Sequence, residues 1–453
     1  MTGRYKAYPE YRKSMIEWMD DVPVHWQNTP LKYMAIENNS LFLDGDWIES
    51  KDISSDGIRY ITTGNVGEGV YKEQGAGFIS DETFKKLACT EVFEGDVLLS
   101  RLNAPIGRAC IVPNLSTRIV TSVDNVIFRP DPHYYKQFLV YLFSSASYFK
   151  HTSNLARGAT MQRISRGLLG NIRVAIPSLE EQQKIANFLD HETSKIDTLI
   201  EKQEKLIELL KEKRQAVISH AVTKGLNPDA PMKDSGVEWL GDVPEHWEVK
   251  KLKHFGVVIG GFAFKSTDFT DTGYPVVKIS NVSHLNLDWG DRSFLPNKYA
   301  VEHKDYIAPK GSLVFAMTRP IISGGIKVFL MEDDSSPLIN QRVGFMKIEN
   351  QSAAFFILQS SQSNSFLAQF TNNMTITNQP NISGEGIGSI SIPFPPQCEL
   401  TEINKKLTKL EVIFKTLTDK SVEQIQLLKE RKTALISAAV TGKIDVRDWQ
   451  GEA

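Results

Sequence analysis

The sequence predicts an α+β protein made of two pseudo-symmetric mixed α/β domains, each followed along the chain by one long α-helix. Three observations support this fold class. The chain repeats itself at an interval of about 220 residues. Each copy begins with short β-like runs broken by glycine and proline, and each ends in a long heptad-patterned segment without proline.

Two pairs of segments establish the repeat. Tyr11–Gln27 matches Met232–Glu248 at eight of 17 positions, and Lys205–Thr223 matches Glu423–Thr441 at eleven of 19. The pairs are offset by 221 and 218 residues. Such a period is too long for a solenoid and indicates a duplicated domain.

The recurring His-Trp pairs belong to this repeat. His25-Trp26 and His246-Trp247 both follow Asp-Val-Pro. Because both copies keep this surrounding sequence, we interpret the pairs as packing elements and not as ligands.

The long helices have clear start and stop signals. Pro177 and Pro395 mark their entries, and Gly225 and Gly442 follow their ends. Within the preceding domains, one helix is expected near Tyr134–Lys150 and its counterpart near Ala353–Phe370. The resulting division assigns two domains with two helices and a tail: 1–178 (with the N-terminal segment), 179–224 (helix), 225–395 (linker and domain), 396–442 (helix) and 443–453 (tail).

Apolar residues follow a heptad pattern in both long segments, which predicts that each helix has an apolar seam. Two such helices in one chain most simply pack on each other, although an ordinary coiled coil between chains would use the same pattern. The seam residues predicted for the first helix are Ile185, Leu189, Ile196, Leu199, Leu206, Leu210 and Val217. Those of the second are Ile403, Leu407, Leu410, Phe414, Leu417, Leu428 and Leu435.

Composition excludes several classes of protein. The net charge of −2 neither indicates nor excludes a nucleic-acid partner, because local patches of charge matter more. No run of about 18 apolar residues occurs, so we expect no membrane span. Three widely spaced cysteines lack metal-ligand spacing and fit the reducing cytoplasm. We find no Walker A sequence, no nucleophile elbow and no zinc-binding His-Glu-x-x-His motif. The chain is therefore expected to bind or organise, without catalysis and without a metal site.

At this point the residues indicate a family. The chain resembles the specificity (S) subunit of type I restriction–modification enzymes over essentially its whole length. The resemblance lies in five phrases and in their duplicated order: GATMQRIS at Gly158–Ser165, IPSLEEQQKIANFLD at Ile176–Asp190, EKRQAVISHAVTKGL at Glu212–Leu226, SGVEWLGDVPEHW at Ser235–Trp247 and FAMTRPIISGGIKV at Phe315–Val328.

The resemblance implies two target recognition domains separated by two long helices, which pack as an antiparallel coiled coil and act as a ruler. Each domain would read one part of a bipartite, asymmetric site in double-stranded DNA. Two modification subunits would methylate adenine with S-adenosylmethionine, and two restriction subunits would add ATP- and Mg-dependent translocation and cleavage. The chain itself would bind none of these cofactors.

Candidate DNA-binding residues gather at two places in each copy. One is the loop that follows a β-like run, Asp96–Ser100 in the first copy, together with its counterpart in the second, because strand-end loops often carry function. The other lies nearer the long helix. His133–Leu179 has six Lys or Arg and no acidic residue, whereas Asn350–Gly384 has no charge and offers amides that can pair with adenine. A solvated surface or a plain loop would have similar sequences. The candidates of the first copy are Arg101, Asn103, Arg108, Arg157, Arg163 and Arg166. Those of the second are Arg319, Lys327, Gln341, Arg342, Asn378 and Gln379.

Two rival functions remain open at the level of sequence. A fused restriction–modification polypeptide would methylate or cut DNA unaided, which the missing motifs argue against. A coiled-coil scaffold without DNA specificity would not distinguish one DNA sequence from another.

Overall fold

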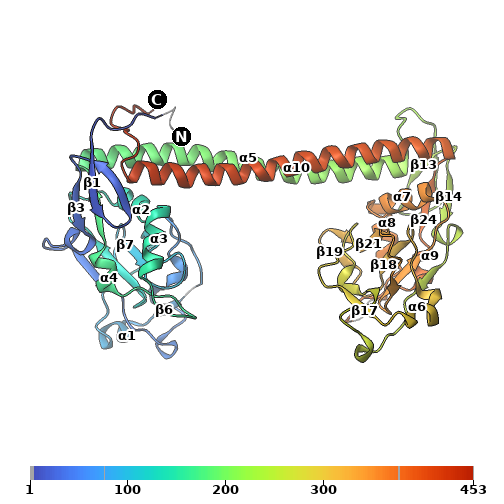
Figure 1. Ribbon diagram of the computed structural model, residues 1–453, viewed down its shortest axis with the longest axis horizontal. Helices are drawn as coiled ribbons and strands as arrows, with labels where there is room; N and C mark the ends of the chain where they lie inside the picture. The colour runs from blue at the N-terminus through green and yellow to red at the C-terminus, as the bar shows by residue number, and fades with distance from the viewer. Residues whose placement is uncertain (1–4, 76, 376–377, 452–453) are drawn as a thin grey trace. The chain divides into compact units, whose positions relative to one another are not determined.

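The computed structural model describes residues 5–75, 77–375 and 378–451, and divides the chain into two compact units. Unit 1 combines the residues up to Gln203 with those from Glu423 onward, and unit 2 is Glu204–Val422. The division falls inside both long helices. Each unit therefore contains a mixed α/β domain and about half of each helix (Figure 1).

Unit 1 is built on two small sheets. A four-stranded antiparallel sheet has the order β4-β10-β7-β8, and a three-stranded mixed sheet has the order β6-β5-β9, with β5 and β9 parallel. These strands are β4 (Leu41–Asp44), β5 (Ile58–Ile61), β6 (Gly77–Ile79), β7 (Val97–Ser100), β8 (Ala109–Ile111), β9 (Ile119–Thr121) and β10 (Asn125–Arg129). Every residue of β7 is buried, as expected for a central strand.

Unit 2 repeats this topology strand for strand. Its four-stranded sheet has the order β15-β23-β18-β21, and its mixed sheet has the order β17-β16-β22, with β16 and β22 parallel. The strands are β15 (Val258–Gly260), β16 (Tyr274–Val277), β17 (Ser293–Leu295), β18 (Leu313–Ala316), β21 (Val328–Leu330), β22 (Leu338–Ile339) and β23 (Val343–Met346). A short hairpin between β18 and β21 is added, formed by β19 (Ile321–Ile322) and β20 (Gly325–Ile326).

Smaller ribbons complete both units. β1 (Tyr11–Ile16) pairs with β2 (Met19–Pro23), and β3 (Gln27–Pro30) pairs with β11 (Arg173–Ile176). Their counterparts in unit 2 are β12 (Met232–Asp234) with β13 (Asp242–Pro244), and β14 (Glu248–Lys251) with β24 (Ser391–Phe394). The repeat seen in the sequence is thus a repeat of structure.

The domain helix predicted in each copy is two helices. In unit 1, α2 (Lys136–Leu142) and α3 (Ala146–Leu155) replace the single helix predicted over Tyr134–Lys150; in unit 2, α7 (Gln351–Ser360) and α8 (Asn364–Asn372) replace the one over Ala353–Phe370. Serines mark the breaks: the hydroxyls of Ser145 and Ser363 donate to the carbonyls three residues earlier, and the Ser363 hydroxyl also accepts from the amide of Phe366 and so caps α8. The shorter helices are α1 (Asp81–Lys86), α4 (Arg166–Asn171), α6 (Lys298–Glu302) and α9 (Gly384–Gly388).

The two long helices are α5 (Leu179–Lys224) and α10 (Gln397–Val440), and they pack together in antiparallel orientation. In unit 1, Lys432 of α10 lies 2.7 Å from Asp197 of α5; in unit 2, Arg214 of α5 pairs with Glu411 of α10. The helices therefore pair within the chain, and Arg214 and Lys432 hold equivalent positions of the repeat.

One row of the predicted seam differs from the structure. Leu199, Leu206 and Leu417 are 46, 42 and 43% exposed. Their neighbours Ile200, Ile207 and Thr418 are less exposed. In α5, Ile200 and Ile207 continue the alternating spacing of three and four residues that includes Ile196, Leu210 and Val217, and in α10 Thr418 continues that of Leu407 and Phe414. Adjacent apolar residues made the register ambiguous in the sequence, and a step of one residue rotates a side chain by about 100° around the helix. The other predicted seam residues are buried or half-buried.

The His-Trp pairs stabilise the first turn of each long helix. His25, Trp26 and Tyr8 all contact the carboxylate of Glu181 in α5, at 2.8, 3.0 and 2.7 Å. In unit 2, His246 and Trp247 contact Glu399 in α10, at 2.7 and 2.9 Å. Both tryptophans are at most 1% exposed, so these motifs are packing elements, as the sequence indicated.

Both ends of the chain belong to unit 1. The amide of Asp445 donates to the carbonyl of Lys6, and the Tyr11 hydroxyl donates to the carbonyl of Gly442. The N-terminal segment and the tail thus lie against each other after α10, where unit 2 has a single continuous linker after α5. Among the described residues, no helix has both the length and the apolar character needed to cross a membrane.

Candidate functional site

Most of the sequence-predicted residues of unit 1 meet at one end of its four-stranded sheet. The loop that follows β7 pairs with the segment Arg157–Arg163 through a bridge between Leu102 and Arg163, and Arg157 and Arg163 bridge to each other. Gly158 lies between them at φ +114°, where a Cβ would come within 2.2 Å of the Met161 carbonyl oxygen. Only glycine permits this tight loop. We call this surface the first polar edge: Asp44, 101–108, Asp124, 157–163 and Arg166.

Arg101 lies beneath the first polar edge and not on it. Its side chain is 5% exposed, donates to the carbonyls of Val123 and Ile164, and lies 3.1 Å from Asp44. Burial lowers the pKa of Arg101, and the Asp44 carboxylate partly offsets this. Its Nε and Asp44 Oδ1 approach each other without forming a directed hydrogen bond. Arg101 therefore fixes the loop after β7, and its guanidinium is unavailable to a ligand in this conformation.

Arg108 also acts as a support. Its guanidinium donates to backbone carbonyls on both sides of the loop, namely those of Thr63, Val66, Leu102, Asn103 and Pro105, at 2.7 to 3.3 Å. Burial lowers the pKa of Arg108 as well. All three nitrogens of this guanidinium donate to the backbone, which leaves at most one N–H of Nη2 for a ligand. Arg108 instead holds the loop that presents Asn103.

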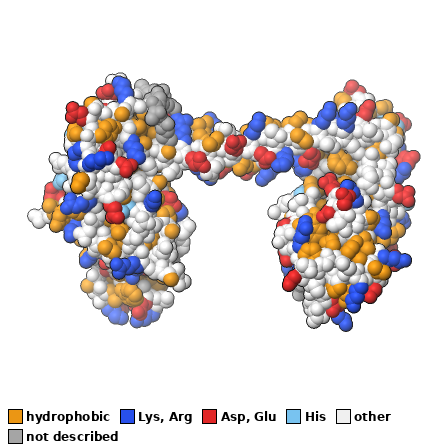
Figure 2. Space-filling view, viewed as in Figure 1, with side chains coloured by type: hydrophobic (Ala, Val, Ile, Leu, Met, Phe, Trp, Pro, Cys, Tyr) orange, Lys and Arg blue, Asp and Glu red, His pale blue; other side chains and the backbone are white. Residues whose placement is uncertain are grey.

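The remaining candidates of unit 1 face the solvent. Arg157 and Asn103 are exposed, and the Arg157 side chain has no ion pair within the described residues. Arg163 lies 2.8 Å from Asp124 and is 43% exposed, and Arg166 lies 3.8 Å from Asp44 and is 42% exposed. Asp44, Arg101, Arg157 and Arg163 line an open hollow of about 600 Å³. On the face that Figure 2 shows, cations and anions are interspersed, so a local cluster matters more than net charge.

Unit 2 builds the same edge with the same backbone contacts. Thr318 bridges to Asn381, and Thr375 bridges to Asn381, as Leu102 and Arg157 bridge to Arg163 in unit 1. Arg319 and Asn103 occupy equivalent positions, and both have left-handed backbones, at φ 45° and 60°. We call this surface the second polar edge: 317–327, Gln341–Arg342 and the described residues among 375–381.

The side chains of the second polar edge differ throughout from those of the first. Arg319, Gln341, Arg342, Asn378 and Gln379 are exposed, and Lys327 is half-buried at the place of Arg108. Met317 replaces Arg101, Gly260 replaces Asp44, Arg342 replaces Asp124 and Asn381 replaces Arg163. The first edge is thus a set of arginines with two carboxylates among them, whereas the second offers amides and cations that form no ion pair within the part of the chain that the structure describes. One backbone frame presents two unlike surfaces.

Sequence reasoning missed the two carboxylates of the first polar edge. Asp44 ends β4, and Asp124 lies immediately before β10. The sheet brings each carboxylate close to an arginine that is distant in sequence: Asp44 is 57 residues from Arg101, and Asp124 is 39 residues from Arg163. No local motif marks them, and only their place at strand ends could have indicated a functional edge.

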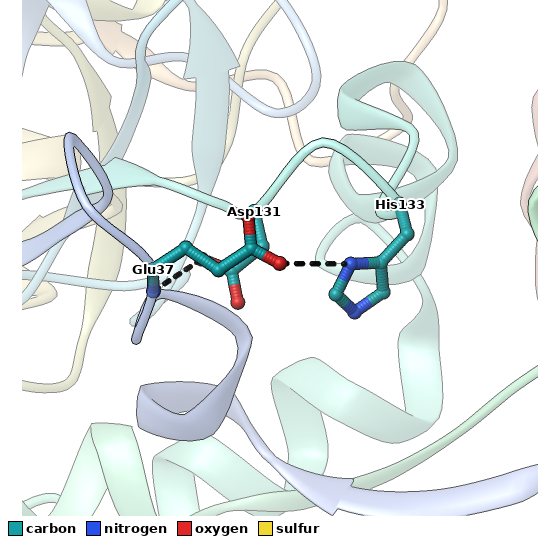
Figure 3. Close-up of side chains that lie close together, drawn as sticks. All are labelled: Glu37, Asp131 and His133. Carbon is teal, nitrogen blue, oxygen red and sulfur yellow. Dashed lines mark hydrogen bonds and ion pairs between the residues drawn. The ribbon is translucent and has the colours of Figure 1, made fainter.

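A separate group of acidic and histidine side chains lies in unit 1. Glu37, Asp131 and His133 place one possible ligand atom each within 4.8 Å of one another (Figure 3). Asp131 is buried and accepts hydrogen bonds from the backbone amides of Ile36 and Glu37, at 3.1 Å each. His133 and Glu37 are exposed and 3.7 Å apart. The contacts of Asp131 explain this group as a loop support, and it carries no metal assignment.

Comparison with known proteins gives a consistent result. The family model described as the type I restriction modification DNA specificity domain matches residues 26–209 and again residues 244–427. The MjaVIII specificity subunit of Methanocaldococcus jannaschii is 30% identical over 298 residues, which cover 64% of this chain and 67% of the relative. The EcoKI specificity subunit of Escherichia coli K12 is 24% identical over 337 residues, covering 72% and 69%.

Solved structures share the fold. A chain from a study titled as the structural basis of complex assembly and conformational transition of the type I R-M system superposes with a TM-score of 0.70 at 14% identity, covering 93% of this chain and 99% of that one. The HsdS subunit of Thermoanaerobacter tengcongensis gives a TM-score of 0.55 at 16% identity, covering 93% and 98%. The structural similarity establishes the fold. The family model matches each half of the chain, which establishes the family.

Proposed function

The chain belongs to the type I restriction–modification DNA specificity family, and we propose that its two polar edges each read one half of a bipartite DNA target. A specificity subunit is the non-catalytic component of its complex and has two target recognition domains. We assign those domains to 1–178 and 225–395. One observation supports the assignment of DNA reading to the two polar edges. Their backbones make equivalent contacts but their side chains differ, as recognition of two different half-sites requires.

The first polar edge combines positioning with base readout. Arg157 is exposed and has no ion pair with any residue that the structure describes, so it is suited to a phosphate, a contact that fixes register without reading sequence. Asn103 stands on a loop held by Arg101 and Arg108, and its amide can pair bidentately with adenine in the major groove. Arg163 and Arg166 already have carboxylate partners, so they contact DNA by exchanging an aspartate for a phosphate or a guanine.

The second polar edge reads by other chemistry. Arg319, at the place of Asn103, can pair bidentately with guanine O6 and N7. Gln341, Asn378 and Gln379 supply amide groups, and Lys327 and Arg342 supply charge near the phosphates. An arginine in place of an asparagine at equivalent positions makes the two half-sites differ.

We propose that α5 and α10 set the unspecified gap between the half-sites. Deletion of one heptad, Glu201–Ile207, keeps the apolar seam of α5 in phase and shortens it by about 10 Å, or roughly three base pairs. Both half-site sequences should be retained while the gap shrinks. A variant that still methylates, with altered half-sites and an unaltered gap, would show that the helices do not set it.

The partners and cofactors follow from the family. We propose that two modification subunits bind the chain and methylate adenine with S-adenosylmethionine, and that two restriction subunits supply ATP- and Mg-dependent cleavage. None of these cofactors is assigned to this chain. The cell's DNA is the proposed target, so we place the protein in the cytoplasm.

The test is reconstitution. The chain, the modification subunit encoded beside it, and their mixture are each given double-stranded DNA and labelled S-adenosylmethionine. Sequence-specific methyl transfer by the mixture, with none by the chain alone, is expected. Methylation by the purified chain alone would favour a fused enzyme, and binding to all DNA with equal affinity would favour a scaffold without specificity.

A further inference from the structure

Unit 2 has an open groove between its two long-helix segments. Lys213, Ala216 and His220 of α5, the linker after it, and Lys406, Leu407 and Leu410 of α10 line a space of about 460 Å³. Leu407 forms its buried floor, whereas Ala216, His220 and Lys406 are exposed at its rim. The groove is therefore apolar at its base and basic at its opening.

The equivalent place in unit 1 is filled by the chain itself. Phe188 replaces Lys406 and is 1% exposed. The rings of Tyr5 and Trp449 both pack edge-on against it, with centroids 5.4 and 5.6 Å away. The Tyr5 hydroxyl donates to Glu192, which stands where unit 2 has Leu410.

The chain ends explain this difference. In unit 1 the N-terminal segment and the tail both lie beside the helix pair, and each contributes one of the two rings. In unit 2 a single linker runs past the corresponding place, and Gly225, Leu226 and Pro228 of this linker line the groove. Pro231 corresponds to Trp449 in the sequence repeat. One groove of the repeat is closed by aromatic side chains, and no Phe, Tyr or Trp among the described residues lines the other.

We propose that the open groove of unit 2 receives an aromatic side chain carried on an acidic segment of the modification subunit. The proposal rests on the proposed function, which supplies that partner. We infer an aromatic side chain because aromatic rings fill the equivalent place in unit 1. The acidity is argued from charge complementarity with Lys213 and Lys406, which line the groove and have no ion pair within the described residues.

The consequence is that the two modification subunits meet unequal surfaces. The one at unit 2 is anchored by an inserted ring, and the one at unit 1 meets a groove already closed. Aromatic anchors in pockets dominate binding at protein interfaces, and loss of one typically costs about 30-fold in affinity.

Two filling variants test this, each adding a ring from a different helix. Ala216→Phe fills the groove from α5, and Lys406→Phe places in unit 2 the residue that unit 1 has as Phe188. Lys211→Phe is the matched control, since Lys211 is exposed on α5 outside the lining. Circular dichroism melting of each full-length variant checks folding, so either filling variant suffices if the other is unstable.

Binding of the purified modification subunit is followed by titration calorimetry and sedimentation velocity. Both filling variants should lose about 30-fold in affinity at one of two sites, while the control binds as the wild type does. Wild-type affinity in the filled variants, or an equal loss in Lys211→Phe, overturns the inference and leaves the proposed function standing. A wild-type chain that binds no modification subunit overturns the proposed partner and the inference with it.

Discussion

Arg157→Ala should lower the salt dependence of DNA binding by the assembled methyltransferase. Arg157 is exposed on the first polar edge and has no ion pair within the described residues, so its full charge is available to a phosphate. One lost phosphate contact reduces the slope of log K against log salt by about 0.9. Raising the salt concentration from 50 to 200 mM should therefore reduce the ratio of wild-type to variant affinity by roughly 3.5-fold.

The assay is fluorescence anisotropy with a labelled duplex that contains the target, at four salt concentrations. Arg118→Ala is the control, because Arg118 belongs to the same unit but is paired with Glu91 and Asp81 away from the edge. Arg163→Ala should weaken binding too, since it both removes a cation and leaves Asp124 facing the DNA. An unchanged slope in Arg157→Ala, or an equal loss in Arg118→Ala, would refute the placement of DNA on this edge.

Three further substitutions test how individual residues contribute to the stability of the fold. Arg101→Met should destabilise the protein by about 1–3 kcal/mol in urea unfolding, because it leaves the carbonyls of Val123 and Ile164 without their donor and removes the nearer of the two cations beside Asp44. Adding Asp44→Gly should recover part of this, since unit 2 has Met317 and Gly260 there. If the double variant is as unstable as the single one, the pair is not coupled. Met15→Gly should raise the free energy of unfolding by roughly 0.5–1 kcal/mol, because exposed Met15 sits at φ 58° where the repeat has Gly236 at φ 70°; a lower urea midpoint would contradict this. Burial lowers the pKa of His284, so the unfolded chain takes up its proton first and the stability from His284 is lost as pH falls below about 6.5. His284→Gln should therefore flatten the fall in urea midpoint between pH 7.5 and 5, and an unchanged pH dependence would exclude this role.

The duplicated architecture was predictable because repeats are a property of sequence. The long helices begin at Leu179 and Gln397, two residues after Pro177 and Pro395, as the proline signals indicated. The seam register was less certain: Leu199 and Ile200 are both apolar, and only packing against α10 selects the second. The sequence predicts one continuous helix across residue 143 and another across residue 361, because serines at a helix break resemble the polar surface of an ordinary helix.

The candidate site was predictable in position but not in roles. Strand-end placement indicated Arg101, Asn103 and Arg108 together, yet only the structure separates the exposed Asn103 from the two supporting arginines. The sequence does not distinguish an arginine that donates to backbone carbonyls from one whose guanidinium is exposed and can bind a phosphate. The sequence did not identify Asp44 as a site residue for a related reason. Its partners are distant in sequence and come close to it only when the domain folds.

The most direct test of the central claim is the map of methylated adenines in a host that expresses this chain with its modification subunit. Wild type should give one asymmetric, bipartite motif with an unspecified gap. Asn103→Ala and Arg319→Ala alter equivalent positions of the two polar edges, so each should relax a different half of that motif and leave the gap unchanged. A continuous motif in the wild type, or relaxation of the same half by both variants, would contradict the assignment of one half-site to each edge.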